Sequence, residues 1–365
     1  MCKGSVVVAM SGGVDSSLAA ALLKNQGFQV MGAFMEVFDE SISELENDCH
    51  ACFGPDEKND LKDARAIAEK LKIPFYALDL KEKYRKKILD FFVSEYLKGN
   101  TPNPCTKCNQ EMKFEAIVEE LNKREINFDY FATGHYAQIE SDPRKNITYL
   151  KKAADQTKDQ SYFLYRFKSH QLKRIIFPLG KYKKEDVRRL AKELKLGVSE
   201  KVESQDFIAG GYHQLFKNAI IPGSILNTRG EVIGEHRGIV FYTIGQRKGI
   251  GISSSKPLYV IAKNEKNNTI TVGTRDRLLG TNLIAKELNW INFDQLTTNL
   301  NIKARIRYQH KEADARIMPI EKKRVLVKFQ EPQLAITPGQ AVVFYNEDVV
   351  VGGGIIEKEV KHEYK

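Results

Sequence analysis

The sequence has no apolar run that approaches the roughly 20 residues a helix needs to cross a bilayer. It leaves no room for a signal peptide, because an apolar strand pattern already begins at Ser5. It also contains no internal repeat and no low-complexity tract. These absences predict a globular protein of the cytoplasm with no membrane partner. At 365 residues the chain exceeds one ordinary core, so two or three domains are expected.

Cysteine is scarce, and none follows Cys108. The five cysteines are Cys2, Cys49, Cys52, Cys105 and Cys108. In a cytoplasmic chain they favour catalysis or metal binding over structural disulfides. The last four form two Cys-x-x-Cys pairs. One pair alone suits a reversible disulfide, in which one thiol carries sulfur and the other resolves it. Two pairs brought together suit zinc or an iron–sulfur cluster, and the spacing leaves both interpretations open.

The sequence lacks Gly-Lys-Ser/Thr and therefore has no Walker A loop, but it has a different glycine turn near its start. The apolar run Val6–Ala9 is typical of a buried parallel strand, and residues 11–13 then read Ser-Gly-Gly. A helix pattern follows over Leu18–Leu23 and closes at Gly27. This order gathers backbone N–H groups around a phosphate at a helix N-terminus. Asp15 lies inside the loop, where a carboxylate requires Mg²⁺ between itself and the phosphates.

The organisation of the chain changes near Gly210. Residues 1–208 alternate strand and helix patterns, which predicts a doubly wound parallel sheet with ligands at the carboxyl ends of its strands. Short strands and turns then indicate a small β-rich domain over 209–280, and alternating patterns indicate a C-terminal β-barrel over 281–365. In the first domain the strand patterns are 28–37, 75–78 and 130–135, and the helix patterns are 61–71 and 84–97.

Positive charge is concentrated in one stretch of the chain. The net charge is +10, and residues 142–200 hold 16 Lys or Arg against 7 Asp or Glu. We interpret this stretch as a helical part that binds a nucleic acid. The alternative is a solvated helix face, which we expect for Lys192 and Lys195.

The second cysteine pair precedes a helix pattern. The pattern runs from Met112 to Leu121 and places Cys108 near a helix start. The helix dipole and the neighbouring Lys107 are therefore expected to lower the pKa of the Cys108 thiol. A thiolate beside a nucleotide loop suggests that sulfur itself is transferred.

Several motifs resemble those of known enzymes. The string Ser-Gly-Gly-Val-Asp-Ser-Ser at 11–17 resembles the pyrophosphate loop of the N-type ATP pyrophosphatases, which adenylate an acceptor and release pyrophosphate. Over essentially its whole length the chain resembles the tRNA-specific 2-thiouridylases, which thiolate the wobble uridine. The further motifs that match in order are Asn-Pro-Cys-x-x-Cys-Asn at 103–109, Thr-Gly-His-Tyr-Ala at 133–137, Lys-Asp-Gln-Ser-Tyr-Phe-Leu at 158–164, Phe-Tyr-Thr-Ile-Gly-Gln-Arg-Lys-Gly at 241–249 and Arg-Tyr at 307–308.

The resemblance implies roles for the matching residues. The implied ATP-binding residues are Ala9, Met10, Ser11, Gly12, Gly13, Val14, Asp15, Ser16, Met35 and Gly134. Those implied to contact the target base or the tRNA are Asn103, Pro104, Cys105, Lys158, Asp159, Gln160, Arg307 and Tyr308. Cys108, Cys105 and Asp15 are the expected catalytic residues. Under the metal interpretation, the ligands are Cys49, Cys52, Cys105 and Cys108.

The reaction implied by the resemblance needs ATP, Mg²⁺ and the anticodon loop of a tRNA. It also needs a persulfide sulfur donor, such as a cysteine desulfurase or a sulfur-relay protein. One departure matters, because the family carries a second catalytic cysteine in a string like Ser-Gln-Glu-Ile-Cys-Phe, and the matching segment 203–211 has none. Two alternatives follow: a non-catalytic RNA-binding protein with a zinc knuckle, and another ligase of the ATP pyrophosphatase group.

Overall fold

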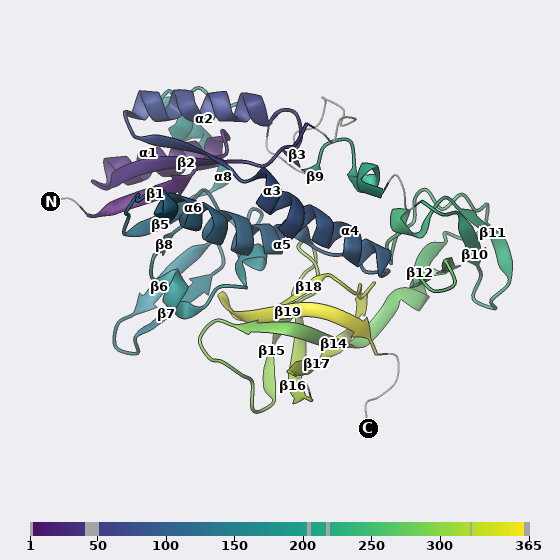
Figure 1. The fold of residues 1–365 in the computed structure, drawn as a ribbon. Helices are drawn as coiled ribbons and strands as arrows, with labels where there is room; N and C mark the ends of the chain where they lie inside the picture. Colours follow the sequence, from purple (N-terminus) through teal and green to yellow (C-terminus); the bar gives the residue numbers. More distant parts are fainter. Residues whose placement is uncertain (1–2, 41–50, 203–205, 217–219, 322, 361–365) are drawn as a thin grey trace.

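The chain is built around three main sheets, which Figure 1 shows in separate parts of the molecule, with the barrel at the lower centre between the other two. The structure, a computed structural model, describes residues 3–40, 51–202, 206–216, 220–321 and 323–360. The first sheet is parallel, the second has four strands, and the third contains an antiparallel barrel. Within these ranges no helix combines the length and the hydropathy that a membrane span requires.

The N-terminal sheet has the strand order β4-β2-β1-β5-β8, and all its pairs are parallel. Its strands are β1 (Ser5–Ala9), β2 (Gln29–Glu36), β4 (Phe75–Asp79), β5 (Tyr130–Thr133) and β8 (Ile175–Ile176). Successive residues of the central strand point to opposite faces, and both faces are buried. Val6 and Val8 pack with α1, α2 and α8, whereas Val7 packs with the helices that follow β4. The predicted doubly wound sheet is confirmed.

The helices around this sheet agree with the predicted patterns, with two local exceptions. The α-helices are α1 (Val14–Asn25), α2 (Glu57–Leu71), α3 (Lys81–Tyr84), α4 (Asp90–Leu97), α5 (Pro104–Cys108), α6 (Ile117–Lys123), α7 (Ser169–Leu172) and α8 (Lys184–Glu193). The exceptions are two π-helical segments, η1 (Arg85–Leu89) and η2 (Asn109–Ala116). Such segments are frequent at functional sites, and η2 directly follows the second cysteine pair.

The second sheet is small and has the strand order β11-β10-β13-β12. Its strands are β10 (Gly223–Leu226), β11 (Val232–His236), β12 (Tyr259–Asn264) and β13 (Thr269–Gly273). Ile225, Val260 and Ile270 are fully buried and form the centre of its separate core. Figure 1 shows this sheet at the opposite end of the molecule from β1 and α1.

The C-terminal strands close into a barrel, as predicted. Strand β14 (Leu279–Trp290) pairs with both β17 (Arg324–Leu334) and β19 (Val349–Glu359), which completes a ring of six antiparallel strands. The other three are β15 (Leu300–Arg305), β16 (Ala313–Ile320) and β18 (Ala341–Asn346). Trp290 is buried in the barrel and stacks on Phe344 at a ring distance of 5.4 Å.

The basic stretch 142–200 is less helical than we predicted. Its first part belongs to a hairpin of β6 (Gln138–Asp142) and β7 (Ile147–Lys151), and β7 extends the barrel sheet by pairing with β19. Leu150 on β7 is fully buried with Tyr345 and Val350 of the barrel, which explains why this segment forms a strand. The only α-helices in this part of the described chain are α7 and α8.

Candidate functional site

The loop between β1 and α1 has the backbone shape that a phosphate site requires. Gly12 has φ +72°, and a Cβ there would lie 2.3 Å from the carbonyl oxygen of Asp60 on α2. Only glycine fits this position without strain. Helix α1 then begins at Val14. Its N-cap residue is Gly13, so no N-cap side chain accepts a hydrogen bond from the first turn. The first N–H groups of α1 are therefore free of a side-chain cap and suited to bind an anion.

Serine hydroxyl groups hold this loop in shape. The Ser17 hydroxyl donates to the Gly13 carbonyl at 2.7 Å, and Ser17 is fully buried. The Ser16 hydroxyl donates to the same carbonyl at 3.2 Å and accepts the Ser11 N–H at 3.1 Å. Ser11 itself is exposed. Its side chain is therefore the hydroxyl of the loop that solvent and ligands reach most readily.

Asp15 is held by two residues from distant parts of the chain. Lys184 Nζ, at the start of α8, lies 2.7 and 2.8 Å from its two carboxylate oxygens. The Tyr136 hydroxyl donates to the carboxylate at 2.7 Å. Sequence reasoning included Lys184 only in the basic stretch. A lysine that lies 169 positions from its partner gives no local signal of the pairing.

The other residues implied to bind ATP lie at the same edge of the sheet. Ala9 ends β1 and pairs with Thr133 of β5, and the next residue, Gly134, packs directly on the loop. A Cβ on Gly134 would lie 2.7 Å from the Asp15 carbonyl carbon and from the Ser16 nitrogen. Met35, near the end of β2, is half-buried. The loop, Gly134 and Met35 therefore all follow or end the central parallel strands, where the sequence placed the site.

The second cysteine pair lies on α5. The Asn103 side chain caps this short helix by accepting the Cys105 N–H at 3.1 Å, and Pro104 follows in its first turn. Cys105 is the second and Cys108 the fifth residue of a helical run that continues without interruption through η2 into α6. The prediction that Cys108 lies near a helix start is confirmed. Lys107, however, turns away from the thiols, because its Nζ pairs with Glu111 and lies 5.0 Å above the ring of Phe91.

Both thiols have raised pKa values, which contradicts the prediction of a thiolate at Cys108. Burial raises the pKa of Cys105 to about 12 and that of Cys108 to about 11. The nearby Lys113 acts in the opposite direction but is outweighed. The physical reason is that Cys108 packs against the apolar cluster under the sheet, where a charged sulfur loses its hydration. Both side chains are therefore thiols at neutral pH.

A third cysteine lies near this pair. Cys52 is the central residue of β3 (Ala51–Phe53) and is exposed, and β3 pairs with β9 (Asp206–Ile208). A negative charge on Cys52 raises the pKa of both Cys105 and Cys108. Among the described residues no group of three or more His, Cys, Asp or Glu could hold a metal ion. Cys49 lies outside the described residues, so the four-cysteine metal site stays a prediction.

Gln160 and Asp159, which the resemblance assigned to the tRNA, are anchored inside the protein. The Gln160 side-chain oxygen accepts the Tyr136 N–H at 2.9 Å, and the Gln160 backbone N–H donates to the Tyr136 carbonyl at 2.8 Å. Asp159 is 3% exposed, accepts hydrogen bonds from Ala153 and Ser161, and faces Arg305 at 3.5 Å. The two residues therefore connect the nucleotide loop to the barrel, and Asp159 has little surface left to offer to RNA.

The motif at 307–308 meets the motifs at 158–164 and 241–249. One terminal nitrogen of Arg307 donates to the carbonyls of Ile244 and Ala335 at 3.0 Å and to the Thr337 hydroxyl. Burial lowers the pKa of Arg307. The Tyr308 ring lies 4.5 Å from that of Phe163. Arg307 thus fixes the junction of the domains, and its contact with tRNA stays a prediction.

The basic stretch divides into paired and exposed cations. Those that pair with carboxylates include Lys151, Lys152, Arg166, Lys184 and Arg189. The cations exposed to solvent include Lys173, Lys181, Lys183, Lys192 and Lys195. The surplus of charge that a polyanion would meet is therefore smaller than the sequence count suggests. Exposed lysines attract a polyanion most at low salt.

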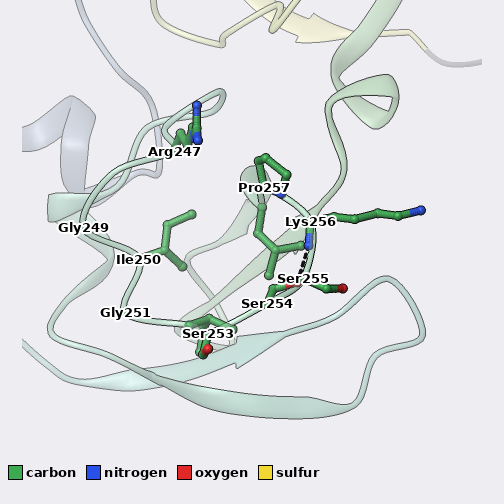
Figure 2. A pocket seen from close by; sticks show the side chains of 11 residues that line it. Arg247, Gly249, Ile250, Gly251, Ser253, Ser254, Ser255, Lys256 and Pro257 are labelled. Atoms are coloured by element: carbon green, nitrogen blue, oxygen red, sulfur yellow. Dashed lines mark hydrogen bonds between the residues drawn. The ribbon is translucent and has the colours of Figure 1, made fainter.

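A pocket of about 550 Å³ lies away from this edge, in the small middle sheet. Figure 2 shows this open pocket lined by the loop from Arg247 to Leu258, with the Lys256 side chain pointing away from it. The Lys256 N–H donates to the Ser254 hydroxyl at 3.4 Å. Neither the nucleotide loop nor the cysteines contribute to its lining, so it is not part of the candidate site.

Comparison with known proteins covers nearly the whole chain. The family described as tRNA methyl transferase HUP domain matches residues 4–209. A tRNA methyl transferase PRC-barrel domain matches 213–274, and an aminomethyltransferase beta-barrel domain matches 280–356.

Several relatives match nearly end to end. The chain is 48% identical to tRNA-specific 2-thiouridylase MnmA 2 of Caldanaerobacter subterraneus subsp. tengcongensis, over 98% of each chain. It is also 48% identical to MnmA 1 of Thermoanaerobacter pseudethanolicus, over 98% of each chain. The identity to MnmA of Acetivibrio thermocellus is 46%, over 98% of this chain and 100% of the relative. With such identity over its whole length, the chain belongs to the tRNA-specific 2-thiouridylase family.

Proposed function

We propose that the protein replaces the C2 oxygen of the wobble uridine in tRNA with sulfur, using ATP to activate that oxygen. The observation that carries the proposal is that one thiol and two residues implied to bind ATP pack against one apolar cluster. Ala9 before the loop, Met35 at the end of β2 and Cys108 on α5 all pack against this cluster. Cys108 therefore lies on the face of the sheet that also holds Ala9 and Met35, at the strand ends beside the loop.

The first step activates the base. The uridine O2 attacks the α-phosphate of ATP, pyrophosphate leaves, and C2 then carries an adenylate. Backbone N–H groups at the start of α1 and the exposed Ser11 hydroxyl stabilise the charge that develops on the phosphate. Asp15 is the carboxylate that would hold Mg²⁺, and the ion would supply charge neutralisation. Lys184 brings a second positive charge to the same place.

The second step delivers sulfur. A cysteine persulfide attacks C2, and AMP leaves with the original oxygen. The sulfur comes from a persulfide donor, such as a cysteine desulfurase or a sulfur-relay protein. Because burial keeps Cys105 and Cys108 protonated, a sulfur atom that has already been loaded onto a cysteine is a better nucleophile than either thiol.

The third requirement is access for the base. Residues 1–208 form the catalytic part. Residues 209–280 and 281–365 help to hold the tRNA. The tRNA meets the enzyme in the cytoplasm. The segment Asn103–Cys108 lies against the 158–164 motif, since the Asn109 side chain donates to the Phe163 carbonyl at 3.3 Å. The anticodon loop leaves the wobble base unpaired, so turning it toward Cys105 costs less than opening a duplex.

The test measures pyrophosphate, AMP and 2-thiouridine formed from ATP with and without unmodified tRNA. We expect pyrophosphate to form at a rate that depends on tRNA, and AMP and 2-thiouridine to appear together when a persulfide donor is added. Asp15→Asn should lose AMP formation, whereas the exposed control Lys195→Met should keep it. AMP formation that is indifferent to tRNA would favour another ligase of the ATP pyrophosphatase group. RNA binding without any AMP would favour a non-catalytic protein.

A further inference from the structure

Three cysteine sulfurs gather beside the nucleotide edge of the sheet. Ala51 and Phe53 on either side of Cys52 are buried in the same apolar cluster that Cys108 packs against. Tyr84 stacks on Phe53 at 5.5 Å, and negative charge on Cys108, Cys52 or Cys105 raises the pKa of Tyr84. Cys108, Ala51, Phe53 and Tyr84 therefore belong to one cluster, and all three cysteines lie near the same buried ring. Strand β3 is fixed in this place by its pairing with β9.

The three cysteines differ in how accessible they are. Cys52 is exposed, whereas Cys105 and Cys108 are half-buried on α5. A protein donor that hands over sulfur must bring its own persulfide into contact with the acceptor thiol, so an exposed cysteine is the better acceptor. The half-buried thiols lie deeper, where solvent is reduced and the sulfur can be released toward the base.

We propose that Cys52 is the cysteine that receives and carries the sulfur, and that a cysteine of α5 resolves it. This inference rests on the proposed function and assigns the second thiol of the reaction, which the sequence lacks after Cys108. Strand β9, the neighbour of β3, belongs to the segment 203–211 in which the resemblance leads one to expect that thiol. Cys52 supplies it from the adjacent strand.

The sulfur atom passes from the donor to the base in three bond exchanges. The Cys52 thiolate attacks the terminal sulfur of the donor persulfide, and the donor leaves as a thiolate. The terminal sulfur, now on Cys52, attacks C2 and displaces AMP, which leaves a disulfide between Cys52 and the base. The Cys105 or Cys108 sulfur attacks Cys52, gives up its proton, and sends the bonding electron pair to the sulfur on C2. The products are 2-thiouridine and a protein disulfide, which an external thiol reductant must reduce before the next turnover.

The test uses the full chain, unmodified tRNA, ATP and glutathione persulfide as the sulfur donor. Peptide mass spectrometry should find the extra sulfur on Cys52, and after one turnover without reductant it should find a disulfide from Cys52 to Cys105 or Cys108. Cys52→Ser should keep tRNA-dependent pyrophosphate release but lose 2-thiouridine, and the AMP released with it, by at least about tenfold. Because Cys52 is exposed, the urea unfolding midpoint of the Cys52→Ser variant should match that of the wild type.

The control variant is the exposed Lys195→Met, which should keep both activities. Full thiolation by Cys52→Ser would overturn the inference and leave the proposed function intact, with Cys105 and Cys108 as the redox pair. Stoichiometric zinc or iron that is lost in both Cys52→Ser and Cys49→Ser would also overturn it, in favour of a metal site. If the wild type forms no AMP in response to tRNA, the proposed function itself fails, which the other outcomes do not imply.

Discussion

Lys184→Met removes the cation that holds Asp15 in the nucleotide loop. Lys184 makes two short contacts to the carboxylate, and its side chain is 10% exposed. After the change, Asp15 keeps the Tyr136 hydroxyl as its partner at 2.7 Å. Breaking a fully buried ion pair by removing one partner costs about 3–5 kcal/mol. Because the Asp15 side chain is 28% exposed, water recovers part of this, and we expect a loss of about 2 kcal/mol.

The assay is urea unfolding followed by circular dichroism, with Lys183→Met as the matched control. Lys183 is the exposed neighbour that precedes α8, so its replacement should change the free energy of unfolding by no more than about 0.5 kcal/mol. The pair should also show coupling, because Asp15→Asn costs less once Lys184 is already methionine. Equal unfolding of the two lysine variants, or strict additivity in the double variant, would refute the ion pair as a stabilising contact.

Three further changes test other parts of the structure. Gly134→Ala places a Cβ 2.7 Å from the backbone of the loop and should lower the free energy of unfolding by about 1–3 kcal/mol. Because the loop must shift, ATP binding measured by calorimetry should also weaken. Burial raises the pKa of Glu57 to about 7, above its ordinary value of 4.5. The folded state therefore loses stability as the pH rises through this range, and Glu57→Gln should remove up to about 3 kcal/mol of that loss between about pH 5 and about pH 8. Arg307→Met removes three hydrogen bonds, and within the described chain only the Ala335 carbonyl among their acceptors keeps another donor, the Thr337 hydroxyl. It should lower the thermal midpoint more than the control Lys303→Met, because Lys303 is an exposed residue of β15.

The features that the sequence predicted well depend on local physics. The apolar run Val6–Ala9 and the glycines that follow determine a strand, a turn and a helix start within a few residues. The alternating barrel strands at 302–308 and 324–329 are likewise recognisable, because one face must be buried. Motif order then identified the edge of the sheet at which the site lies.

The features that could not be predicted from the sequence depend on contacts between distant segments. Lys184 reaches Asp15 only because α8 packs against α1 in the folded chain. The raised pKa of Cys108 comes from an apolar cluster whose members are spread over the first 209 residues, whereas the helix dipole and Lys107 are visible locally. Similarly, nothing within 138–151 reveals that this hairpin will extend a barrel formed nearly 200 residues later.

The central claim is that the uridine oxygen becomes a leaving group on AMP before sulfur replaces it. The most direct measurement supplies tRNA whose wobble uridine carries a heavy oxygen isotope at O2, together with ATP and a persulfide donor. Mass spectrometry of the released AMP should find one heavy oxygen for each 2-thiouridine formed. Unlabelled AMP alongside thiolated tRNA would show that ATP does not activate this oxygen and would contradict the account.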